Sequence, residues 1–202
     1  EFAHMAARAG AKVTVVDTGK RPLHAFDPDL VKALKKYSES LGITFIFEAK
    51  PTSLKKKRKK HILSYEVKGD IKTIEAHMVF NTAGRVPALA ELDLDKGNVD
   101  FTDSGVVTDD FLQSKSNVNV YACGDVSDKN LPLTPLSGRQ GYVVAENIIN
   151  GNKKELEVPV VPSVVFTLPN LATVGYSEEE ARTRYKNIIV NYEVSTVWFN
   201  AK

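Results

Sequence analysis

Two short glycine motifs are the residues of this chain best suited to chemistry. Residues 82–85 (TAGR) follow the apolar segment 78–80, and residues 121–125 (YACGD) follow a predicted strand over 117–120. Each motif places a glycine just beyond a strand end, where a backbone without Cβ lets another molecule come close. Asp125 adds a carboxylate that accepts hydrogen bonds from sugar-like hydroxyls. The two motifs favour a protein that binds extended cofactors.

Asp17 is a third candidate, because it follows the predicted strand over residues 12–16. In a dinucleotide-binding fold, an acidic residue at the end of the second strand binds the ribose of the adenosine half and repels a 2′-phosphate. Asp17 therefore favours NADH over NADPH. Lys20 and Arg21 could meet a 2′-phosphate, but we expect them in solvent. A solvated turn carboxylate is the alternative interpretation of Asp17.

Thr134 and Pro135 open the best-defined predicted helix, residues 134–150, as its N-cap and first helical residue. The preceding loop, 126–133, returns the helix start toward the sheet edge that carries Gly124. Unpaired N–H groups and about half a positive charge at that start suit a ring edge that becomes anionic on reduction. A capped helix after a loop is the structural alternative.

The elements that must position these residues predict an α/β fold. Strand 12–16, a helix from Asp27 to Gly42 and strand 43–47 form half of a doubly wound parallel sheet. An antiparallel excursion follows before the main sheet resumes at residues 78–82. The predicted excursion strands are 50–56, 60–67 and 71–76. The later predicted strands are 106–109, 118–122, 163–167, 172–175 and 188–194, with a last helix opened by the capping box at Ser177.

Composition narrows the class of protein. The 202 residues carry a net charge of +2, which gives no argument for a nucleic-acid partner. Cys123 is the single cysteine and is interpreted as a small apolar filler, and the four histidines show no metal-ligand spacing. Residues 55–60, six consecutive cations, are interpreted as a solvated hairpin tip. The histidine spacing therefore predicts no metal site. No membrane-spanning run or secretory signal is visible, so we expect a cytoplasmic protein.

At this point the motifs resemble a known family. Residues 82–87 (TAGRVP) are similar to the "ATGRxP" signature of the two-dinucleotide-binding flavoproteins, and residues 120–126 (VYACGDV) resemble their second FAD signature. Residues 133–135 (LTP) also match, and residues 164–181 are similar to the opening of the dimerisation domain. The order of the motifs places the chain with the pyridine nucleotide–disulfide oxidoreductases, which include glutathione reductase, dihydrolipoamide dehydrogenase and mercuric reductase.

The resemblance implies a role for each matching residue. Asp125 would bind the ribityl chain of FAD, with Gly124 allowing the approach, and the helix start would face the flavin pyrimidine edge. Gly84 would lie near the nicotinamide nucleotide, and Asp17 would bind its adenine ribose. The remaining residues placed by the resemblance are Arg85 beside Gly84, Leu133, Thr134 and Pro135 at the helix start, and Glu1, which matches a glutamate that supports the flavin side. No catalytic residue is otherwise expected here.

The resemblance also implies an organisation. Residues 1–87 correspond to an NAD(P)-binding domain without its first strand and glycine-rich loop, 88–155 to the second half of an FAD-binding domain, and 156–202 to the beginning of an interface domain. The family's first FAD-binding loop, its Cys-x4-Cys redox pair and its C-terminal His/Glu pair have no counterpart. We therefore expect a piece of a longer protein, inactive alone, whose whole form is a homodimer.

The expected reaction passes hydride from a nicotinamide, NADH rather than NADPH, to FAD and then to a disulfide-like small molecule or protein. Two alternatives stay open at this stage. The parent protein could be an NADH oxidase or ferredoxin-reductase-type flavoenzyme without the redox pair, or the chain could serve only as a nucleotide-binding or dimerisation module.

Overall fold

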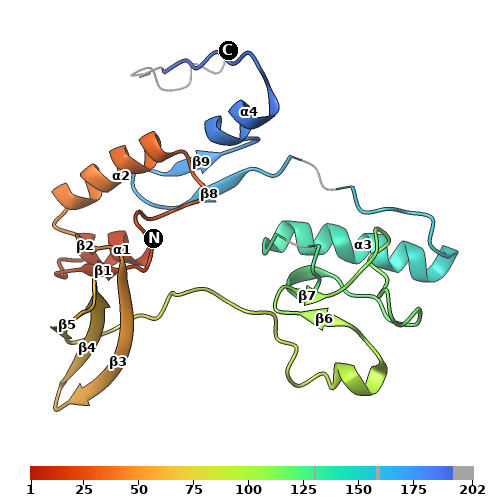
Figure 1. Cartoon of the computed structure of the whole chain (residues 1–202), viewed down its shortest axis with the longest axis horizontal. Coiled ribbons are helices and arrows are strands. Elements are labelled where there is room, and N and C mark those ends of the chain that lie inside the picture. The colour runs from red at the N-terminus through yellow and green to blue at the C-terminus, as the bar shows by residue number, and fades with distance from the viewer. Residues whose placement is uncertain (130, 158–159, 193–202) are drawn as a thin grey trace. The chain divides into compact units, whose positions relative to one another are not determined.

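The computed structural model describes residues 1–129, 131–157 and 160–192, and the chain divides into two compact units (Figure 1). The first unit contains residues 1–80 together with the described residues from 160 onward, and the second contains residues 81–159 apart from those not described. Both units mix helices with short strands, so the predicted α/β class is confirmed.

The first unit contains the predicted strand–helix–strand arrangement. Strand β1 (Thr14–Val16) pairs in parallel with β2 (Thr44–Ile46), and helix α2 (Pro28–Ser40) connects them. The helix begins where predicted, because the Asp27 carboxylate accepts hydrogen bonds from the first exposed backbone N–H groups of the helix. It ends just before Gly42, whose φ of 84° suits a residue without a Cβ.

A three-stranded antiparallel sheet follows, as predicted for the excursion. Its strands are β3 (Ala49–Lys57), β4 (Lys60–Val67) and β5 (Asp70–Ala76), in that spatial order. The β3–β4 turn is formed by Arg58 and Lys59, so the strands extend further into the lysine run than predicted.

The remaining elements of the first unit are α1 (Phe2–Arg8), β8 (Ser163–Val165), β9 (Leu171–Thr173) and α4 (Glu178–Arg184). Strands β8 and β9 pair antiparallel and are shorter than predicted. The capping box is confirmed, because the Ser177 hydroxyl accepts from the backbone N–H of Glu180 while the Glu180 carboxylate accepts from that of Ser177. The hydrophobic core of the unit is formed by Phe26, Val31, Leu34 and Leu171, with Leu23 and Val165 packed against it.

In the interior of the first unit, His4 joins α1 to α2 and to the loop between β8 and β9. Its Nε2 lies 2.8 Å from Ser38 Oγ on α2, and its Nδ1 lies 3.3 Å from the backbone nitrogen of Leu168. Ser38 donates its own proton to the Leu34 carbonyl, so the serine accepts from Nε2–H while Nδ1 accepts from the Leu168 N–H. Burial, with the positive amino terminus adding to it, lowers the pKa of His4. The neutral imidazole is therefore the form that fits this position.

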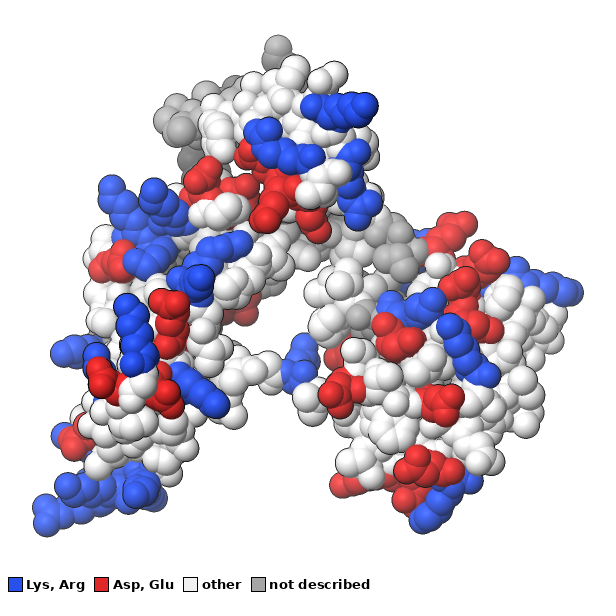
Figure 2. Space-filling model, viewed as in Figure 1, with Lys and Arg blue, Asp and Glu red and all other residues white. Residues whose placement is uncertain are grey.

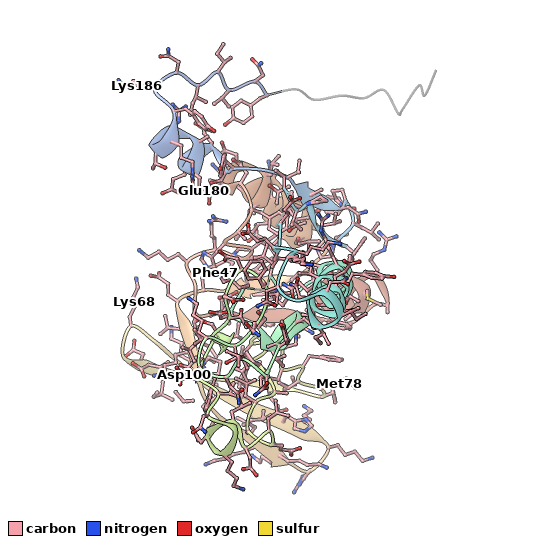
Figure 3. The ribbon with its side chains drawn as sticks, turned by 90° about the vertical axis from the view of Figure 1, so that its right-hand side faces the viewer. Phe47, Lys68, Met78, Asp100, Glu180 and Lys186 are labelled. Carbon is pink, nitrogen blue, oxygen red and sulfur yellow. The ribbon has the colours of Figure 1, made fainter. Side chains whose placement is uncertain are left out.

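Two predicted strands are wrong in the described residues. Residues 78–82 belong to no strand, and Met78, labelled in Figure 3, is 67% exposed. The Phe80 ring stacks on Phe2 rather than entering a sheet. Residues 188–192 form no strand either, and the rest of the predicted strand 188–194 lies outside the described residues. Apolar composition marked both segments as strands, but a strand needs a partner backbone to satisfy its N–H and C=O groups.

The second unit consists of short strands and one long helix. Strand β6 (Phe101–Thr102) pairs with β7 (Gly105–Val106), and two 3₁₀ turns, η1 (Leu94–Gly97) and η2 (Gly124–Val126), precede helix α3 (Thr134–Asn150). Its core contains Val99, Val106 and Ala122, with Leu89, Leu94, Val120 and Val126 packed against them.

The strands predicted over 106–109 and 117–122 are mostly absent from this unit. Only Val106 of the first belongs to a regular strand, and the second is a turn, closed by the bond from Val120 N to Asn117 O, followed by a single bridge between Tyr121 and Gln113. The Asn117 side chain favours the turn, because its Oδ1 accepts from the N–H of Asn119.

Candidate functional site

The site in the second unit is built around Gly124. The chain is extended at Cys123 and then turns at Gly124, which has a φ of 73° that residues with a Cβ rarely adopt. The backbone N–H of Gly124 donates to Oε1 of Gln140 across 2.6 Å. Gln140 is fully buried on α3, so the turn is fastened to the helix from the inside.

Gln140 was missed by the sequence reasoning, although the sequence contains a signal for it. The inward face of α3 is formed by Leu136, Gln140, Val143 and Asn147, at helical spacing. Two of these four positions are polar. A polar residue on the buried face of an amphipathic helix needs a hydrogen-bond partner, and that requirement points to a fixed neighbouring backbone.

Asn147 supplies the second fastening of α3. Its Nδ2 donates to the carbonyls of Phe111 and Lys154, at 3.1 and 2.8 Å. Its Oδ1 accepts from the backbone N–H groups of Lys153 and Lys154. The amide side chain thus joins the C-terminal half of α3 to two separate backbone segments.

The predicted N-cap at Thr134 is wrong by one position. Leu133 occupies the cap with extended backbone angles, and its carbonyl accepts from the N–H groups of Leu136 and Ser137. No side chain caps this helix start, because the backbone takes up helical angles at Thr134 itself. Pro135 still lies in the first turn, where its missing N–H removes no helical hydrogen bond. Both Thr134 and Pro135 are exposed.

The start of α3 lies beside the Gly124 turn, as predicted. A Cβ added to Gly124 would lie 3.4 Å from Cβ and Oγ of Ser137, in the first turn of the helix. Asp125, the second residue of the turn, is exposed. The structure therefore brings together Gly124, Asp125, Leu133, Thr134 and Pro135 of the residues predicted for the flavin side.

A polar layer supports this turn from beneath. Asp128 Oδ1 accepts from both the N–H and the hydroxyl of Thr108, and the backbone N–H of Asp128 donates to the Val106 carbonyl. Gly105 allows the two backbones to approach, since a Cβ there would lie 2.7 Å from the Ser127 carbonyl carbon. The Asp125 carboxylate is thus carried on a turn that is held from two sides.

Asp17 lies in the first unit, directly after β1. Its backbone N–H donates to the Ile46 carbonyl, which extends the β1–β2 pairing by one bond. Its Oδ1 accepts from the N–H of Gly19 at 2.7 Å, so the carboxylate closes a tight turn. A Cβ added to Gly19 would lie 2.2 Å from Nε2 of His24, which shows how closely the imidazole lies over this backbone.

Arg21 is held inside the same loop instead of extending freely into solvent. Its Nη1 donates to the carbonyls of Pro22 and Leu23, and its Nη2 donates to that of His24. The guanidinium is half-buried, whereas Lys20 is exposed. The expectation that both side chains lie in solvent is therefore correct for Lys20 and wrong for Arg21.

The other residues predicted for the site are Gly84, Arg85 and Glu1. Gly84 and Arg85 are exposed, and a Cβ added to Gly84 would meet nothing within 4 Å. The Glu1 carboxylate accepts from the backbone N–H of Phe166 in the first unit. Cys123 is a free, half-buried thiol.

The described residues contain neither a metal-binding cluster nor a membrane-spanning helix. No group of three or more His, Cys, Asp or Glu side chains there is placed to hold a metal ion. In the same residues, no helix combines the length and apolarity needed to cross a membrane.

Comparison with known proteins identifies the family. The model of the pyridine nucleotide-disulphide oxidoreductase family matches residues 1–141. The chain belongs to this family. A dihydrolipoyl dehydrogenase from Staphylococcus aureus is 36% identical over 178 residues, which cover 87% of the chain and 37% of that enzyme. An uncharacterised 19.7 kDa protein of a Staphylococcus aureus mercuric resistance operon is 46% identical over 112 residues, covering 55% of the chain and 62% of that protein.

Solved structures agree with this assignment. A Cu(II) complex of a mutant of the HOCl-induced flavoprotein disulfide reductase RclA from Escherichia coli matches with a TM-score of 0.81 and 25% identity. The match covers 91% of the chain and 41% of the RclA chain. The chain thus matches between 37% and 62% of the length of these relatives.

Proposed function

We propose that this chain forms parts of the FAD and nicotinamide sites of an FAD-dependent, NADH-using oxidoreductase of the disulfide reductase type. The observation that carries the proposal is the Gly124–Asp125 turn, fastened to α3 by Gln140 beside the exposed helix start. This cluster combines a carboxylate, a close backbone approach and the positive end of a 17-residue helix in one place.

The residues fit the chemistry of a flavin nucleotide. The exposed Asp125 carboxylate would accept hydrogen bonds from a polyhydroxyl chain, and Gly124 lets the turn that carries Asp125 lie close to the start of α3. Leu133, Thr134 and Pro135 present the positive end of the α3 dipole to a ring edge that gains negative charge. When bound, FAD supplies the hydride-accepting ring system, while the protein positions it and tunes its charge.

Asp17 supports a preference for NADH on the nicotinamide side. One carboxylate oxygen accepts from the Gly19 N–H, and the other would accept from a ribose hydroxyl. Arg21, the nearest guanidinium in the sequence, is engaged by three backbone carbonyls and would have to give these up to bind a 2′-phosphate. Gly84 and Arg85 would contribute the exposed backbone that faces the nicotinamide half.

The organisation proposed for the whole protein follows the family. Residues 1–87 would serve the nicotinamide domain, 88–155 the FAD domain and 156–202 a homodimer interface, with a disulfide-like acceptor and a cytoplasmic setting. Glu1 would support the flavin side. We propose that residues 1–202 alone do not catalyse, and reductase activity of the purified chain without added cofactor would contradict this.

Ligand-dependent melting tests the proposal. Purified chain is heated with FAD, NADH or NADPH, and binding raises the melting temperature because the ligand stabilises only the folded form; at ten times Kd the gain is about 1.4 kcal/mol. Asp125→Asn should lose most of the FAD shift, while Asp103→Asn, an exposed aspartate of the same unit, should retain it. The NADH shift should exceed the NADPH shift. No shift with any of the three would favour a non-catalytic module.

A further inference from the structure

The tip of the β3–β4 hairpin is a concentrated cationic surface that the proposed function does not use. Residues 55–60, here called the basic tip, are Lys-Lys-Lys-Arg-Lys-Lys, and all six are exposed. In Figure 2 they form the dense blue group at the lower left, at the end of the hairpin labelled β3 and β4 in Figure 1.

The strand register distributes these cations over both faces of the hairpin. Successive side chains of a strand point to opposite faces, so Lys55 and Lys57 share one face and Lys56 lies on the other. Lys60 lies directly opposite Lys57, on the same face. Arg58 and Lys59 form the turn itself, with Arg58 at a φ of 54°. The tip is therefore cationic on both faces and at its end.

Few acidic groups balance this charge. Among the described residues, Glu75 is the carboxylate that forms an ion pair with the tip, at 2.5 Å from Lys60 Nζ. That hydrogen bond, together with the charge of Lys60, lowers the pKa of Glu75. Lys68, which Figure 3 labels, lies at the β4–β5 turn, at the opposite end of β4, and is not part of the basic tip. Like charges facing each other across strands destabilise a hairpin, as Lys57 and Lys60 do here, so an anionic partner would relieve a cost already present.

We propose that the basic tip binds double-helical nucleic acid through its phosphates, with the end of the β3–β4 hairpin inserted into the major groove. The hairpin is two-stranded at that end, because β5 pairs with β4 only as far as the Ala76–His61 pair. A two-stranded β-ribbon fits the width of the B-DNA major groove, whose two walls are lined by phosphates. Cations on both faces of the ribbon meet both walls. A membrane surface, in contrast, is reached by one face only, and residues 55–60 include no apolar side chain to enter a bilayer. Binding of this kind positions the protein without reading sequence.

Salt dependence of binding to a labelled duplex of arbitrary sequence tests the proposal. With five cations outside the Glu75 pair, log Kobs should fall against log[salt] with a slope of about −4.5, or about 500-fold between 50 and 200 mM. Lys55→Gln/Lys57→Gln/Lys59→Gln should reduce the slope to about −1.8, or about 12-fold over the same range. The matched control is Lys12→Gln/Lys32→Gln/Lys36→Gln, which removes the same charge from exposed positions of the same unit and should keep the steep slope.

Three results would overturn the inference. The first is equal loss of binding in the two triple variants, since whole-chain charge would then explain it. The second is equal affinity for single-stranded and duplex DNA, which would exclude the groove. The third is co-sedimentation with phosphatidylserine vesicles without duplex binding. Circular dichroism melting of both variants establishes that each remains folded.

Discussion

Replacement of Gln140 by leucine should loosen the turn that carries Asp125. Leucine is close in size to glutamine but cannot form its hydrogen bonds, so the variant loses the acceptor for the buried Gly124 N–H, whose nitrogen lies 2.6 Å from Oε1. A buried donor left without a partner costs about 1–3 kcal/mol. The variant should therefore unfold at a urea concentration about 1 M lower, given a slope of about 1–3 kcal/mol/M.

Two measurements check this expectation. Urea unfolding followed by circular dichroism gives the change in stability, and amide hydrogen exchange gives the opening of the turn, which should show as faster exchange at Gly124. Arg139→Gln, at the neighbouring exposed position of α3, is the control and should change stability by less than about 0.5 kcal/mol. The reasoning is refuted if Gln140→Leu retains wild-type stability and full protection of the Gly124 amide.

Three further predictions concern other parts of the chain. The pKa of His4 is lowered in the folded protein, so neutral His4 contributes fully to the unfolding free energy above pH 6.5, its unfolded pKa. That contribution is lost as the pH falls through the lower folded pKa. In a pH series of unfolding free energies, His4→Gln should therefore show a weaker pH dependence below 6.5. Gly105→Ala should lower the free energy of unfolding in urea by about 2–4 kcal/mol, because the φ of Gly105 is 134° and a Cβ would meet the backbone of Ser127. Gly141→Ala, where a Cβ on α3 meets no atom within 4 Å, should raise it by about 0.5–1 kcal/mol. Ser177→Ala should lower the unfolding free energy by about 1 kcal/mol through loss of the cap of α4, and an unchanged melting temperature would contradict this.

The sequence predicted those elements whose signals are local. Helix α2 has an aspartate cap and a terminal glycine, the lysine run and Gly69 mark hairpin turns, and the capping box marks α4, so each appears near its expected position. The strands predicted at 78–82 and 117–122 failed for a common reason. Apolar composition identifies a segment that is able to pair, whereas pairing depends on a partner backbone that no local pattern specifies.

The candidate site was predictable to a similar degree. The glycine and carboxylate of the turn, and the helix beside it, followed from motifs. The hydrogen bond that holds this turn to α3 was not foreseen, because Gln140 bonds a backbone group 16 positions away. The bonds of Arg21 in the Asp17 loop were not foreseen either, because they depend on the direction of the loop carbonyls. In both cases the partner is a main-chain atom, and the position of a main-chain atom cannot be read from the residue types.

Asn147 also bonds main-chain atoms, and this affects which positions around it can vary among homologous sequences. The four hydrogen bonds that its side chain forms with described residues all join main-chain atoms of Phe111, Lys153 and Lys154, whose own side chains take no part in them. Substitutions at those three positions can therefore accumulate without disturbing the joint, provided that the asparagine stays. In a set of homologous sequences, the joint would appear as one constant residue surrounded by neighbours that change independently of it.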